Sequence, residues 1–531
     1  MDNLVEQIII AQRRRNFMEN QYETIIIGAG HNGLVAAAYL AKAGKNVLVL
    51  ERRPIVGGSV VSESFGDGFT VDPVWPGGTL RPDIIRDLKL SLPGDASTAV
   101  AALPPLSAKP AFISLQSDSN HLTLDPDPPK AAESIKRFSE KDAGRWGEFV
   151  SFMDKAAHVL DITYATIMPR LPKNFSLEEG YELLELGLDL RLMGRRDMLN
   201  FIRALPMTAQ ELVDEYFESE QLKAALAAVA IHGSTLGPMS AGTGYTLIHN
   251  WLNRGGLAHV NVGKAGEITQ ALADAVRAYG GEIRVDAEVS RIQVDMYTCR
   301  GVVLANGEEI FADRVISAVD PRRTFLSLVG PLNLPPEFVW KVQSIKMRGS
   351  VAKVHLLTDG SHGIPEGTVV LAPSIQYLEK AYDAAKYGEI SGQPYLEVTT
   401  SGNVVSIHFQ FAPYALKTSG WNAEVSKVEK LAVDTLAEYF VNLKSSIVNR
   451  KSFTPKDLED LYGLTEGDLN HGQLLLDQFL FMRPIPGWSN HRTPIDHLYL
   501  CGSGVHGGGG VSGAAGRNVI RVLNQNRAGH V

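Results

Sequence analysis

Short apolar runs alternate with glycine-rich stretches near the start of the chain. Glu23–Ile27 is a short apolar run, which predicts a strand buried on both faces. Residues 32–42 are rich in Ala and Leu and predict a helix that ends at Gly44. Asn46–Leu50 predicts a second buried strand. The order strand, helix, strand predicts a βαβ unit with a parallel sheet.

A similar pattern returns near the end of the chain. Residues 497–500 predict a short strand, a glycine-rich loop follows, and residues 513–524 predict a helix. The middle of the chain adds further elements of the same kind. They are a helix over 268–279, strands over 282–285, 287–294 and 315–318, and a hairpin of 301–304 with 309–312. We therefore expect one discontinuous nucleotide-binding domain, made of residues 21–90, 260–330 and 470–531.

The intervening segments, 91–259 and 331–469, predict a mixed α+β substrate domain. Helices are expected over 178–192, 209–231 and 423–443, strands over 351–357 and 404–411, and surface loops at the prolines of 104–105 and 126–129. Residues 1–20 predict a separate amphipathic segment that ends in three arginines. We rank docking onto its own protein first; a membrane-surface helix, a transit peptide and a true start at Met18 are alternatives.

The glycines after the first strand form a G-x-G-x-x-G motif. Gly28 permits a tight turn, Gly30 lets the backbone approach a pyrophosphate, and Gly33 lets the helix pack on the strand. The helix N-terminus would face the phosphates. Glu51 ends the second strand 18 residues after Gly33, where a carboxylate binds a ribose diol. This order of elements predicts a dinucleotide site.

The residues that follow Glu51 help to choose between NAD and FAD. Arg52, Arg53 and the pair Gly57-Gly58 come next, and this run resembles the second FAD motif of the phytoene desaturase and FAD-dependent amine oxidase superfamily. For the two arginines, solvated side chains after a strand are the alternative. Further likeness lies in Val213–Glu220, Gly242–Tyr245 and Leu500–Asn518. It is strongest to the subgroup that contains the carotenoid ketolases and the pyridine nucleotide-disulfide oxidoreductase domain-containing protein 2.

The resemblance implies FAD as the cofactor and an α/β fold, with a Rossmann-like FAD-binding domain of the glutathione reductase-2 type and a discontinuous substrate domain. It implies that the last strand and helix return to the nucleotide domain, and that the helix N-terminus faces the flavin, where it stabilises negative charge. It also implies that Val289 lies against the adenine. The expected cofactor-binding residues are Gly28, Gly30, His31, Asn32, Gly33, Glu51, Arg52, Gly57, Gly58, Val289, Gly502, Ser503, Val511, Ser512 and Gly513.

Composition narrows the classes of function. A net charge of −8 implies no general affinity for nucleic acid, and no run of 18 apolar residues predicts a membrane span. Cys299 and Cys501 form no C-x-x-C pair, which excludes dithiol exchange of the glutathione reductase kind. No His–Cys cluster has metal-ligand spacing, so no metal is expected.

The low cysteine count indicates a reducing compartment. We expect a cytoplasmic protein, with peripheral contact to a membrane left open. The mitochondrial matrix is the alternative if residues 1–20 act as a transit peptide. The residues do not specify an oligomeric state.

Three side chains are candidates for catalysis, each with a structural alternative. His506 lies in the rear glycine loop, where it acts on substrate or bonds loop backbone. Tyr245 lines the flavin face or packs in the core, and His232 is a catalytic group or a satisfied interior histidine. Arg483 approaches the flavin or closes the site, and a surface arginine is the alternative. A flavin thioether at Cys501 is conceivable, although a small buried residue is the simpler interpretation.

The resemblance implies a FAD-dependent desaturase or dehydrogenase that takes a hydride from a hydrophobic, carotenoid- or isoprenoid-like small molecule. A ketolase or amine oxidase on the same scaffold is one alternative. A flavin-bound interaction protein without turnover is an alternative of another class, because one fold hosts many functions.

Overall fold

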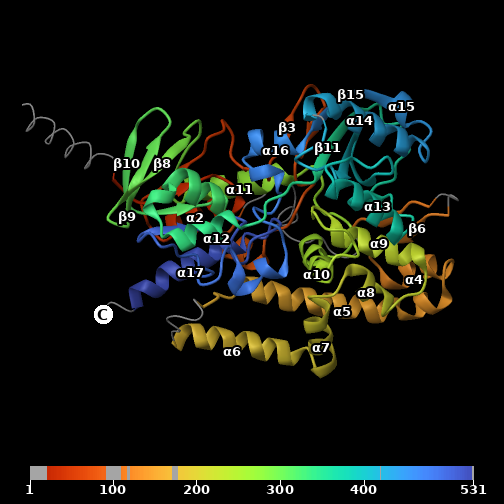
Figure 1. The fold of residues 1–531 in the computed structure, drawn as a ribbon, viewed down its shortest axis with the longest axis horizontal. Coiled ribbons are helices and arrows are strands. Elements are labelled where there is room, and N and C mark those ends of the chain that lie inside the picture. Colours follow the sequence, from red (N-terminus) through yellow and green to blue (C-terminus); the bar gives the residue numbers. More distant parts are fainter. Residues whose placement is uncertain (1–20, 91–108, 117–119, 170–176, 419, 529–531) are drawn as a thin grey trace, which may run out of the picture.

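Two seven-stranded sheets lie side by side in the molecule, with helices packed on both (Figure 1). The computed structural model describes residues 21–90, 109–116, 120–169, 177–418 and 420–528 of the 531-residue chain. The predicted segment 1–20 and the prolines of 104–105 lie outside the described residues. Among the described helices, none has the length and apolar character that a bilayer crossing requires.

The first sheet holds the nucleotide-binding motif. Its strand order is β7-β2-β1-β10-β9-β8, and β16 also pairs with β10. The strands β7, β2, β1, β10 and β16 run parallel, whereas β9 and β8 join as antiparallel neighbours. The carboxyl ends of β1, β2, β10 and β16 therefore meet at one edge of the sheet. The strands are β1 (Gln21–Ile27), β2 (Val47–Leu50), β7 (Glu282–Arg284), β8 (Val289–Asp295), β9 (Thr298–Leu304), β10 (Glu309–Ser317) and β16 (Leu498–Leu500).

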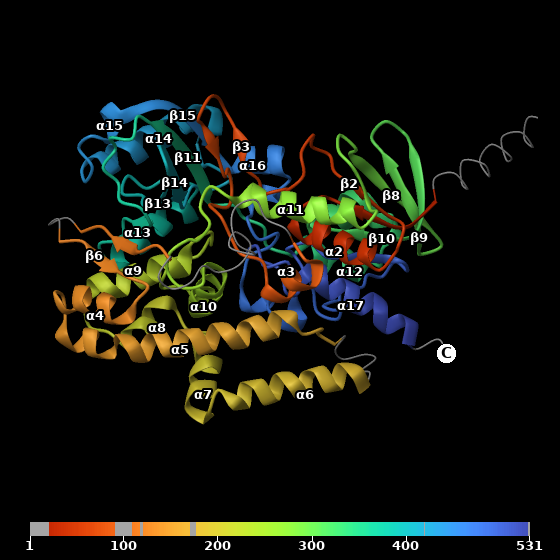
Figure 2. The same cartoon turned by 180° about the vertical axis from the view of Figure 1, so that it is seen from behind.

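Both faces of the first sheet are covered, which explains the continuous apolar runs of its parallel strands. Ile26 packs toward α2 (His31–Lys42), α11 (Ala265–Ala278) and α17 (Ala514–Ala528). Its neighbours Ile25 and Ile27 pack on the other side, with η2 (Arg323–Val329) and α12 (Pro336–Gln343). Figure 2 shows α2 and α11 next to each other along the sheet. The predicted Rossmann-like α/β class is confirmed.

The second sheet has the order β15-β11-β14-β13-β12-β5-β6, with β12 and β5 parallel and all other pairs antiparallel. One face packs on α14 (Trp421–Ala437) and α15 (Leu443–Ser446). The other face packs on a helical layer that contains α5, α9 and α10. The strands are β5 (Phe112–Ser114), β6 (Leu122–Leu124), β11 (Val351–Thr358), β12 (Thr368–Val370), β13 (Tyr395–Ser401), β14 (Val404–Gln410) and β15 (Ile447–Phe453).

The helical layer runs beneath both sheets in Figure 1. Its longest member, α5 (Glu140–Ala165), packs against α10 and α17, and α6 and α7 lie along its outer side. The other helices of this layer are α4 (Pro128–Lys136), α6 (Leu177–Leu192), α7 (Arg195–Ala204), α8 (Ala209–Asp214), α9 (Glu220–Ile231) and α10 (Thr243–Arg254). The remaining elements are β3 (Glu63–Ser64), β4 (Thr70–Val71), α3 (Pro82–Leu88), η3 (Pro331–Asn333), α13 (Ile375–Lys386), α16 (Pro455–Tyr462), η4 (Thr465–Gly467), η5 (Leu476–Gln478) and η6 (Leu480–Met482).

Some predicted boundaries were wrong for identifiable reasons. The helix expected over 209–231 is two helices, because the Asp142 carboxylate accepts the amide hydrogens of Glu218 and Ser219 and fixes a turn between them. The strands expected over 309–312 and 315–318 form one strand, β10. The helix expected over 423–443 ends at Ala437. Pro128 begins α4 rather than a loop, since proline suits the first turn of a helix.

Candidate functional site

A cavity opens where β1, β2, β10 and β16 end. Its walls come from the loops that follow these strands and from residues 287–289 at the start of β8. In open α/β sheets, ligands bind in a crevice at the carboxyl ends of the strands. We call this hollow the cofactor cavity.

The three motif glycines shape one end of the cofactor cavity. Gly28 has φ of +96°, a conformation that favours glycine, and a Cβ at Gly33 would overlap the Gly28 carbonyl oxygen. A Cβ at Gly30 meets nothing within 4 Å, so this position faces open space. Gly30 is also the N-cap of α2, and no side chain caps that helix. The first amides of α2 and the bare Gly30 backbone thus form a cradle for an anion.

Glu51 provides the acidic group of the cavity. It is buried, and its two carboxylate oxygens accept hydrogen bonds from the amides of Ala29, at 2.8 Å, and Arg53, at 3.0 Å. The Glu51 carbonyl oxygen accepts the amide of Ala287 at 2.8 Å, which brings Val289 to the same wall. Each carboxylate oxygen keeps further acceptor capacity, as the binding of a ribose diol requires.

Arginines line the same side of the cavity. Arg52 donates to the Asp460 carbonyl oxygen at 3.0 Å, and Arg53 pairs with Glu63 at 2.6 Å, so both are tied to protein partners. Arg53 is largely buried, which contradicts its interpretation as a solvated charge, whereas the hydrogen bond of Arg52 is exposed to solvent. Arg323, on η2, also lines the cavity, and no motif in the sequence pointed to it.

Ten of the fifteen expected cofactor-binding residues line the cofactor cavity: Gly28, Gly30, His31, Asn32, Gly33, Glu51, Arg52, Gly58, Val289 and Ser503. Gly57 and Gly502 do not line the cavity. A Cβ at either position would come too close to a backbone oxygen, so both glycines pack tightly against neighbouring backbone. Val511, Ser512 and Gly513 lie against α3 and its leading loop instead. The Ser512 carbonyl oxygen accepts the Arg81 amide at 3.0 Å, and a Cβ at Gly78 would overlap Val511. In this structure these three residues do not form part of the cavity wall.

The donor set fits a dinucleotide. An uncapped helix N-terminus and an open glycine position suit a diphosphate, and a buried carboxylate at the end of β2 suits a ribose. A family model for NAD(P)-binding Rossmann-like domains matches residues 26–79. A second model, flavin containing amine oxidoreductase, matches residues 74–516.

The chain belongs to the flavin-containing amine oxidoreductase family.

Relatives and solved structures agree with this assignment. The chain is 31% identical to the pyridine nucleotide-disulfide oxidoreductase domain-containing protein 2 of Rattus norvegicus, over 95% of this chain and 94% of the relative. It is 24% identical to one component of the limonene dehydrogenase of Castellaniella defragrans (95% and 95%) and 26% identical to a lycopene-forming phytoene desaturase of Pantoea ananas (93% and 96%). The structure of cyclohexylamine oxidase from Brevibacterium oxydans shares the fold, with a TM-score of 0.53 and 16% identity over 95% of this chain and 99% of that one.

The predicted superfamily and its cofactor are thereby confirmed. Like other flavin-containing amine oxidoreductases, the chain is a FAD-dependent oxidoreductase, and FAD supplies the capacity to accept a hydride. The residues of the chain then bind and orient the cofactor, exclude water and hold protons near the reacting molecule.

A buried polar layer lies between α5 and α10 in this flavin-containing amine oxidoreductase. The hydroxyl of Tyr164, on α5, is 2.7 Å from the Tyr245 hydroxyl and 2.7 Å from His249 Nδ1. Burial raises the pKa of Tyr245 to about 12, and burial together with the nearby Arg483 lowers the pKa of His249 to about 3. Tyr245 is therefore a neutral, hydrogen-bonded hydroxyl inside the protein. It does not line the cofactor cavity.

His506 has a backbone partner. Its Nε2 donates to the Thr163 carbonyl oxygen at 3.0 Å, and burial lowers its pKa to about 4. The rear glycine loop is thus held to the end of α5 by a neutral imidazole. The expected alternative was a bond to loop backbone, and the partner is a helix carbonyl instead.

Arg483 is buried, so its interpretation as a surface residue is wrong. Its guanidinium donates to the carbonyl oxygens of Asn470 (2.7 Å), Gly472 (3.3 Å) and Ser503 (2.8 Å). It therefore joins two loops, one of which contributes His471 and the other Ser503 to the cofactor cavity. Burial lowers the pKa of this guanidinium.

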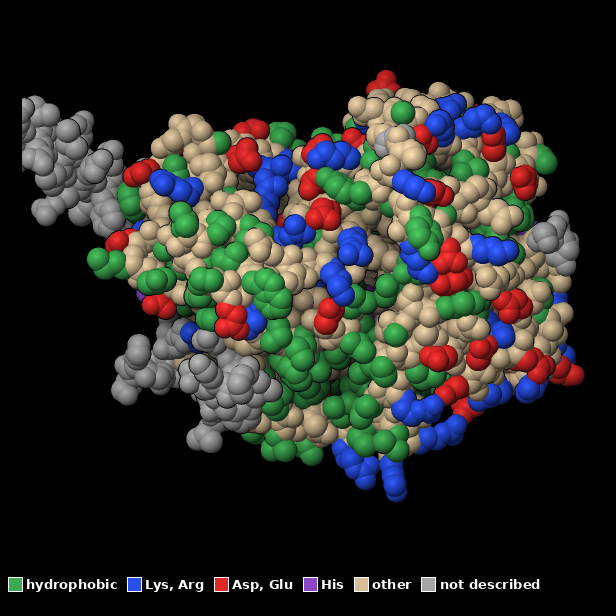
Figure 3. All heavy atoms as spheres, viewed as in Figure 1, with side chains coloured by type: hydrophobic (Ala, Val, Ile, Leu, Met, Phe, Trp, Pro, Cys, Tyr) green, Lys and Arg blue, Asp and Glu red, His purple; other side chains and the backbone are tan. Residues whose placement is uncertain are grey.

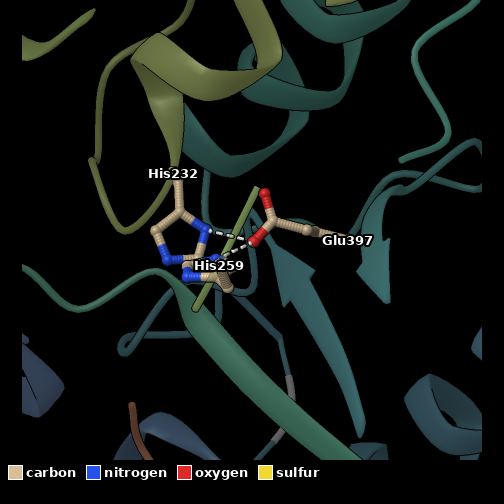
Figure 4. Close-up of side chains that lie close together, drawn as sticks. All are labelled: His232, His259 and Glu397. Carbon is tan, nitrogen blue, oxygen red and sulfur yellow. Dashed lines mark hydrogen bonds and ion pairs between the residues drawn. The ribbon is translucent and has the colours of Figure 1, made fainter. Parts of the chain in front are cut away.

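His232 lies far from the motif glycines in sequence and joins a buried cluster (Figure 4). His232 Nδ1 lies 3.0 Å and His259 Nε2 lies 2.5 Å from the same oxygen of Glu397, and Arg254 approaches the other oxygen at 3.1 Å. Burial alone would raise the pKa of Glu397, but Arg254 and the two histidines hold it well below its usual range. Burial lowers the pKa of His232 to about 3 and that of His259 to about 4. The cluster is a carboxylate held by a guanidinium and two neutral imidazoles.

The ligand atoms of His232, His259 and Glu397 lie within 4.8 Å of one another, which is close enough to hold a metal ion. Sequence spacing could not reveal this group, because its members come from a turn, a loop and a strand. Cys501, in contrast, packs with Ile26 and Val519 in the apolar core beside α2, and its side chain does not line the cofactor cavity.

Proposed function

We propose that the chain is a FAD-dependent dehydrogenase that takes a hydride from a hydrophobic, isoprenoid-like molecule collected at a membrane surface. The observation that carries this proposal is an apolar surface on α6 and α7, which we call the α6–α7 face. Its members are exposed to between 48% and 81%. They are Tyr181, Leu184, Leu188, Leu192, Leu199 and Ile202.

The α6–α7 face is one continuous stripe. Tyr181, Leu184, Leu188 and Leu192 follow helical spacing and so lie on one side of α6, while Leu186 is buried on the other side. Figure 3 shows apolar side chains gathered over α6 and α7, with basic side chains at their lower edge. Arg191 and Arg195 are exposed at this end. Apolar patches rimmed by arginine are typical of helices that lie in the interface of an anionic membrane.

The same surface is fixed to the part of the chain that holds the cofactor. Glu182, on α6, accepts the amide of Ile167 at 2.8 Å and pairs with Arg521 of α17 at 2.9 Å. Helix α5 leads from this region inward to Tyr164 and the buried polar layer. A molecule that leaves a membrane at α6 thus meets elements that contact the cofactor loops.

Two relatives bear names of enzymes that act on apolar isoprenoids, limonene dehydrogenase and phytoene desaturase, and their likeness spans more than nine-tenths of the chain. This supports the proposed substrate class. The competing interpretation is a flavin-bound interaction protein, in which the α6–α7 face binds another protein.

The test uses purified, flavin-loaded protein under anaerobic conditions. We expect an isoprenoid donor dissolved in anionic vesicles to bleach the flavin absorbance, and to do so faster than the same donor in detergent. The double variant L184D/L188D should keep its flavin and lose the acceleration by vesicles. Val441→Asp, which places the same charge at another exposed apolar residue, should behave as the unmodified chain.

Contrary outcomes separate the alternatives. Flavin that dithionite bleaches but no isoprenoid donor reduces would favour the interaction protein. Hydrogen peroxide formed in step with turnover in air would favour an oxidase. Unchanged vesicle dependence in L184D/L188D would overturn collection at a membrane.

A further inference from the structure

A broad, open groove runs along α11 on the first sheet. One wall comes from residues 54–62, which follow β2, and the other comes from α11, whose lining residues extend from Gly266 to Arg277. We call it the α11 groove. Figure 2 shows α11 on the near side of the first sheet. The apolar lining of the groove consists of Pro54, Ile55, Val56, Val61, Ala271 and Val285.

Part of this apolar lining is open to water. Ile55 and Val285 are each 37% exposed. The Asp286 amide donates to the Arg53 carbonyl oxygen at 3.1 Å, so Val285 lies beside the loop that carries Ile55. Apolar side chains that gather along one solvent-exposed groove are typical of a binding surface.

The α11 groove and the cofactor cavity share the loop of residues 54–62. Thr269 lines the groove, and its hydroxyl donates to the Val60 carbonyl oxygen at 2.9 Å. A Cβ at Gly57 would lie 2.9 Å from the same hydroxyl oxygen, and the next residue, Gly58, lines the cofactor cavity. A ligand in the groove therefore contacts the outer side of a loop whose inner side faces the cofactor.

The chain has an apolar segment of matching length. In residues 1–15, which lie outside the described residues, Leu4, Val5, Ile8 and Ile9 share one face of a helix by their spacing. Fifteen helical residues span about 22 Å. The 14 residues of α11 span about 21 Å. The segment can therefore cover the groove from end to end.

The start of β1 lies at the same edge of the sheet as one end of the groove. The strands β7, β2 and β1 are parallel neighbours in this order, so their first residues lie at one edge. Helix α11 ends at Ala278, shortly before β7 begins at Glu282. The step from β1 to β7 covers two strand spacings, about 10 Å. Residues 16–20 can span about 16 Å, which is enough for this step.

The charges of the segment match this orientation. Arg13–Arg15 would lie near the C-terminal end of α11, where the helix dipole is negative. Asp2 and Glu6 would lie near its N-terminal end, where the dipole is positive and the exposed Lys264 is the N-cap. The opposite orientation would place like charges together at both ends.

We infer that residues 1–15 dock in the α11 groove as a helix and brace, from outside, the loop that supplies Gly58 to the cofactor cavity. The occupant of the groove is thus the N-terminal segment of the same chain. Docking covers Ile55 and Val285 with the apolar face of the segment. The inference does not depend on the substrate proposed above.

Trypsin tests the docking, because Arg13–Arg15 are cleavage sites and a protease requires locally unfolded chain. The protein is the full, flavin-loaded chain, and its intact mass shows the loss of the segment. We expect Ile8→Asp, in the segment, and Ile55→Asp, in the groove, each to accelerate this cleavage at least about tenfold, since each removes a buried aliphatic contact. The double variant I8D/I55D should be cleaved no faster than the faster single variant.

Two further variants support the comparison. Val285→Asp places a charge on the other side of the groove and should act as Ile55→Asp does. Val441→Asp is the control, because Val441 is 83% exposed and does not line the groove, and it should be cleaved as slowly as the unmodified chain. Flavin absorbance and thermal unfolding show that each variant is folded. If a groove variant fails to fold, Ile8→Asp still decides, because it changes only the segment.

Release of FAD after dilution tests the brace. Ile8→Asp leaves every residue of the cofactor cavity unchanged. We expect it to lose FAD at least about threefold faster than the unmodified chain, because the loop of residues 54–62 then opens more often. Val441→Asp should release FAD at the unmodified rate.

Contrary outcomes are distinct. Cleavage that is equally fast in the unmodified chain and in Ile8→Asp, or unaffected by both Ile55→Asp and Val285→Asp, would overturn docking in this groove. Protection that rises with protein concentration would assign the groove to a second copy, and protection that requires anionic vesicles would assign the segment to a membrane; each would overturn the inference. Unchanged FAD release in Ile8→Asp would overturn the brace.

Discussion

The backbone amide of Gly516 donates a hydrogen bond of 3.2 Å to Oδ1 of Asn32, although 484 residues separate the two. A Cβ at Gly516 would overlap the Asn32 carbonyl oxygen, so the two helices touch backbone to backbone. Asn32 lies in the first turn of α2, and Gly516 lies in the first turn of α17. The two ends of the chain therefore build a single cradle.

Gly516→Ala should weaken this cradle. We expect a loss of about 1–3 kcal/mol in the free energy of unfolding, because an added methyl group forces α17 away from α2. Urea denaturation measures it. Gly144→Ala in α5 is the control, since a Cβ there meets nothing within 4 Å; equal stability of the two variants would contradict the close approach.

Gly30→Val should remove FAD without unfolding the chain. Gly30 has φ of −70°, which valine adopts, and its side chain would project into open space in the cofactor cavity. The valine side chain would compete with the diphosphate of FAD for this space. We expect the binding free energy of FAD to weaken by about 1–3 kcal/mol, which is roughly a five- to hundredfold loss of affinity. The measurement is the flavin content of the folded variant, read from its absorbance at the same protein concentration as the unmodified chain. A full complement of flavin in the variant would mean that the diphosphate does not bind at Gly30.

Tyr164→Phe should destabilise the chain more than Tyr245→Phe. The first change leaves both the Tyr245 hydroxyl and His249 Nδ1 without their shared partner, whereas the second removes one bond only. Each buried group left unpaired costs about 1–3 kcal/mol. Unfolding free energies of the single and double variants form a cycle, and purely additive effects would show that the hydroxyls do not interact.

Acid should destabilise the fold through its buried histidines. The pKa of His506 falls from 6.5 to about 4 on folding, so the unfolded chain binds this proton first as pH decreases. Its stabilisation is complete above pH 6.5 and is lost progressively between pH 6.5 and 4, to a limit of roughly 3 kcal/mol. His31 and His249 act in the same direction. Asp72 opposes them, because burial raises its pKa to about 6 and its contribution is lost as pH rises toward that value.

His506→Gln should flatten this pH dependence. Thermal unfolding at pH 7, 6, 5 and 4 gives the slope, with His158→Gln, at an exposed position of α5, as the control. A slope that is the same in both variants would mean that His506 is accessible to protons in the folded chain.

Neither cysteine should react with a thiol reagent in the native protein. Burial raises the pKa of Cys299 to about 12 and also raises that of Cys501. We expect no labelling at pH 8 and two thiols per chain in denaturant.

Acid precipitation should release FAD into the supernatant; flavin that stays with the protein would reveal a covalent bond.

The sequence predicted the cofactor cradle well because its signals are local. The spacing of Gly28, Gly30 and Gly33 identifies them as a nucleotide-binding motif, and the position of Glu51 directly after a strand identifies it as the ribose ligand. Tyr164 and Arg323 carry no such signal, since each reaches its site only through the packing of a helix. His232 was singled out, but its partners His259 and Glu397 could not be, because a helix end, a loop and a strand bring them together.

A single planar group, the Arg483 guanidinium, fastens the loop that contains Asn470 and Gly472 to the start of the rear glycine loop. Its donors have a fixed fork geometry, so one accepting carbonyl cannot shift without disturbing the others. Because the same guanidinium also holds Ser503, a shift of the Asn470–Gly472 backbone carries over to the wall of the cofactor cavity.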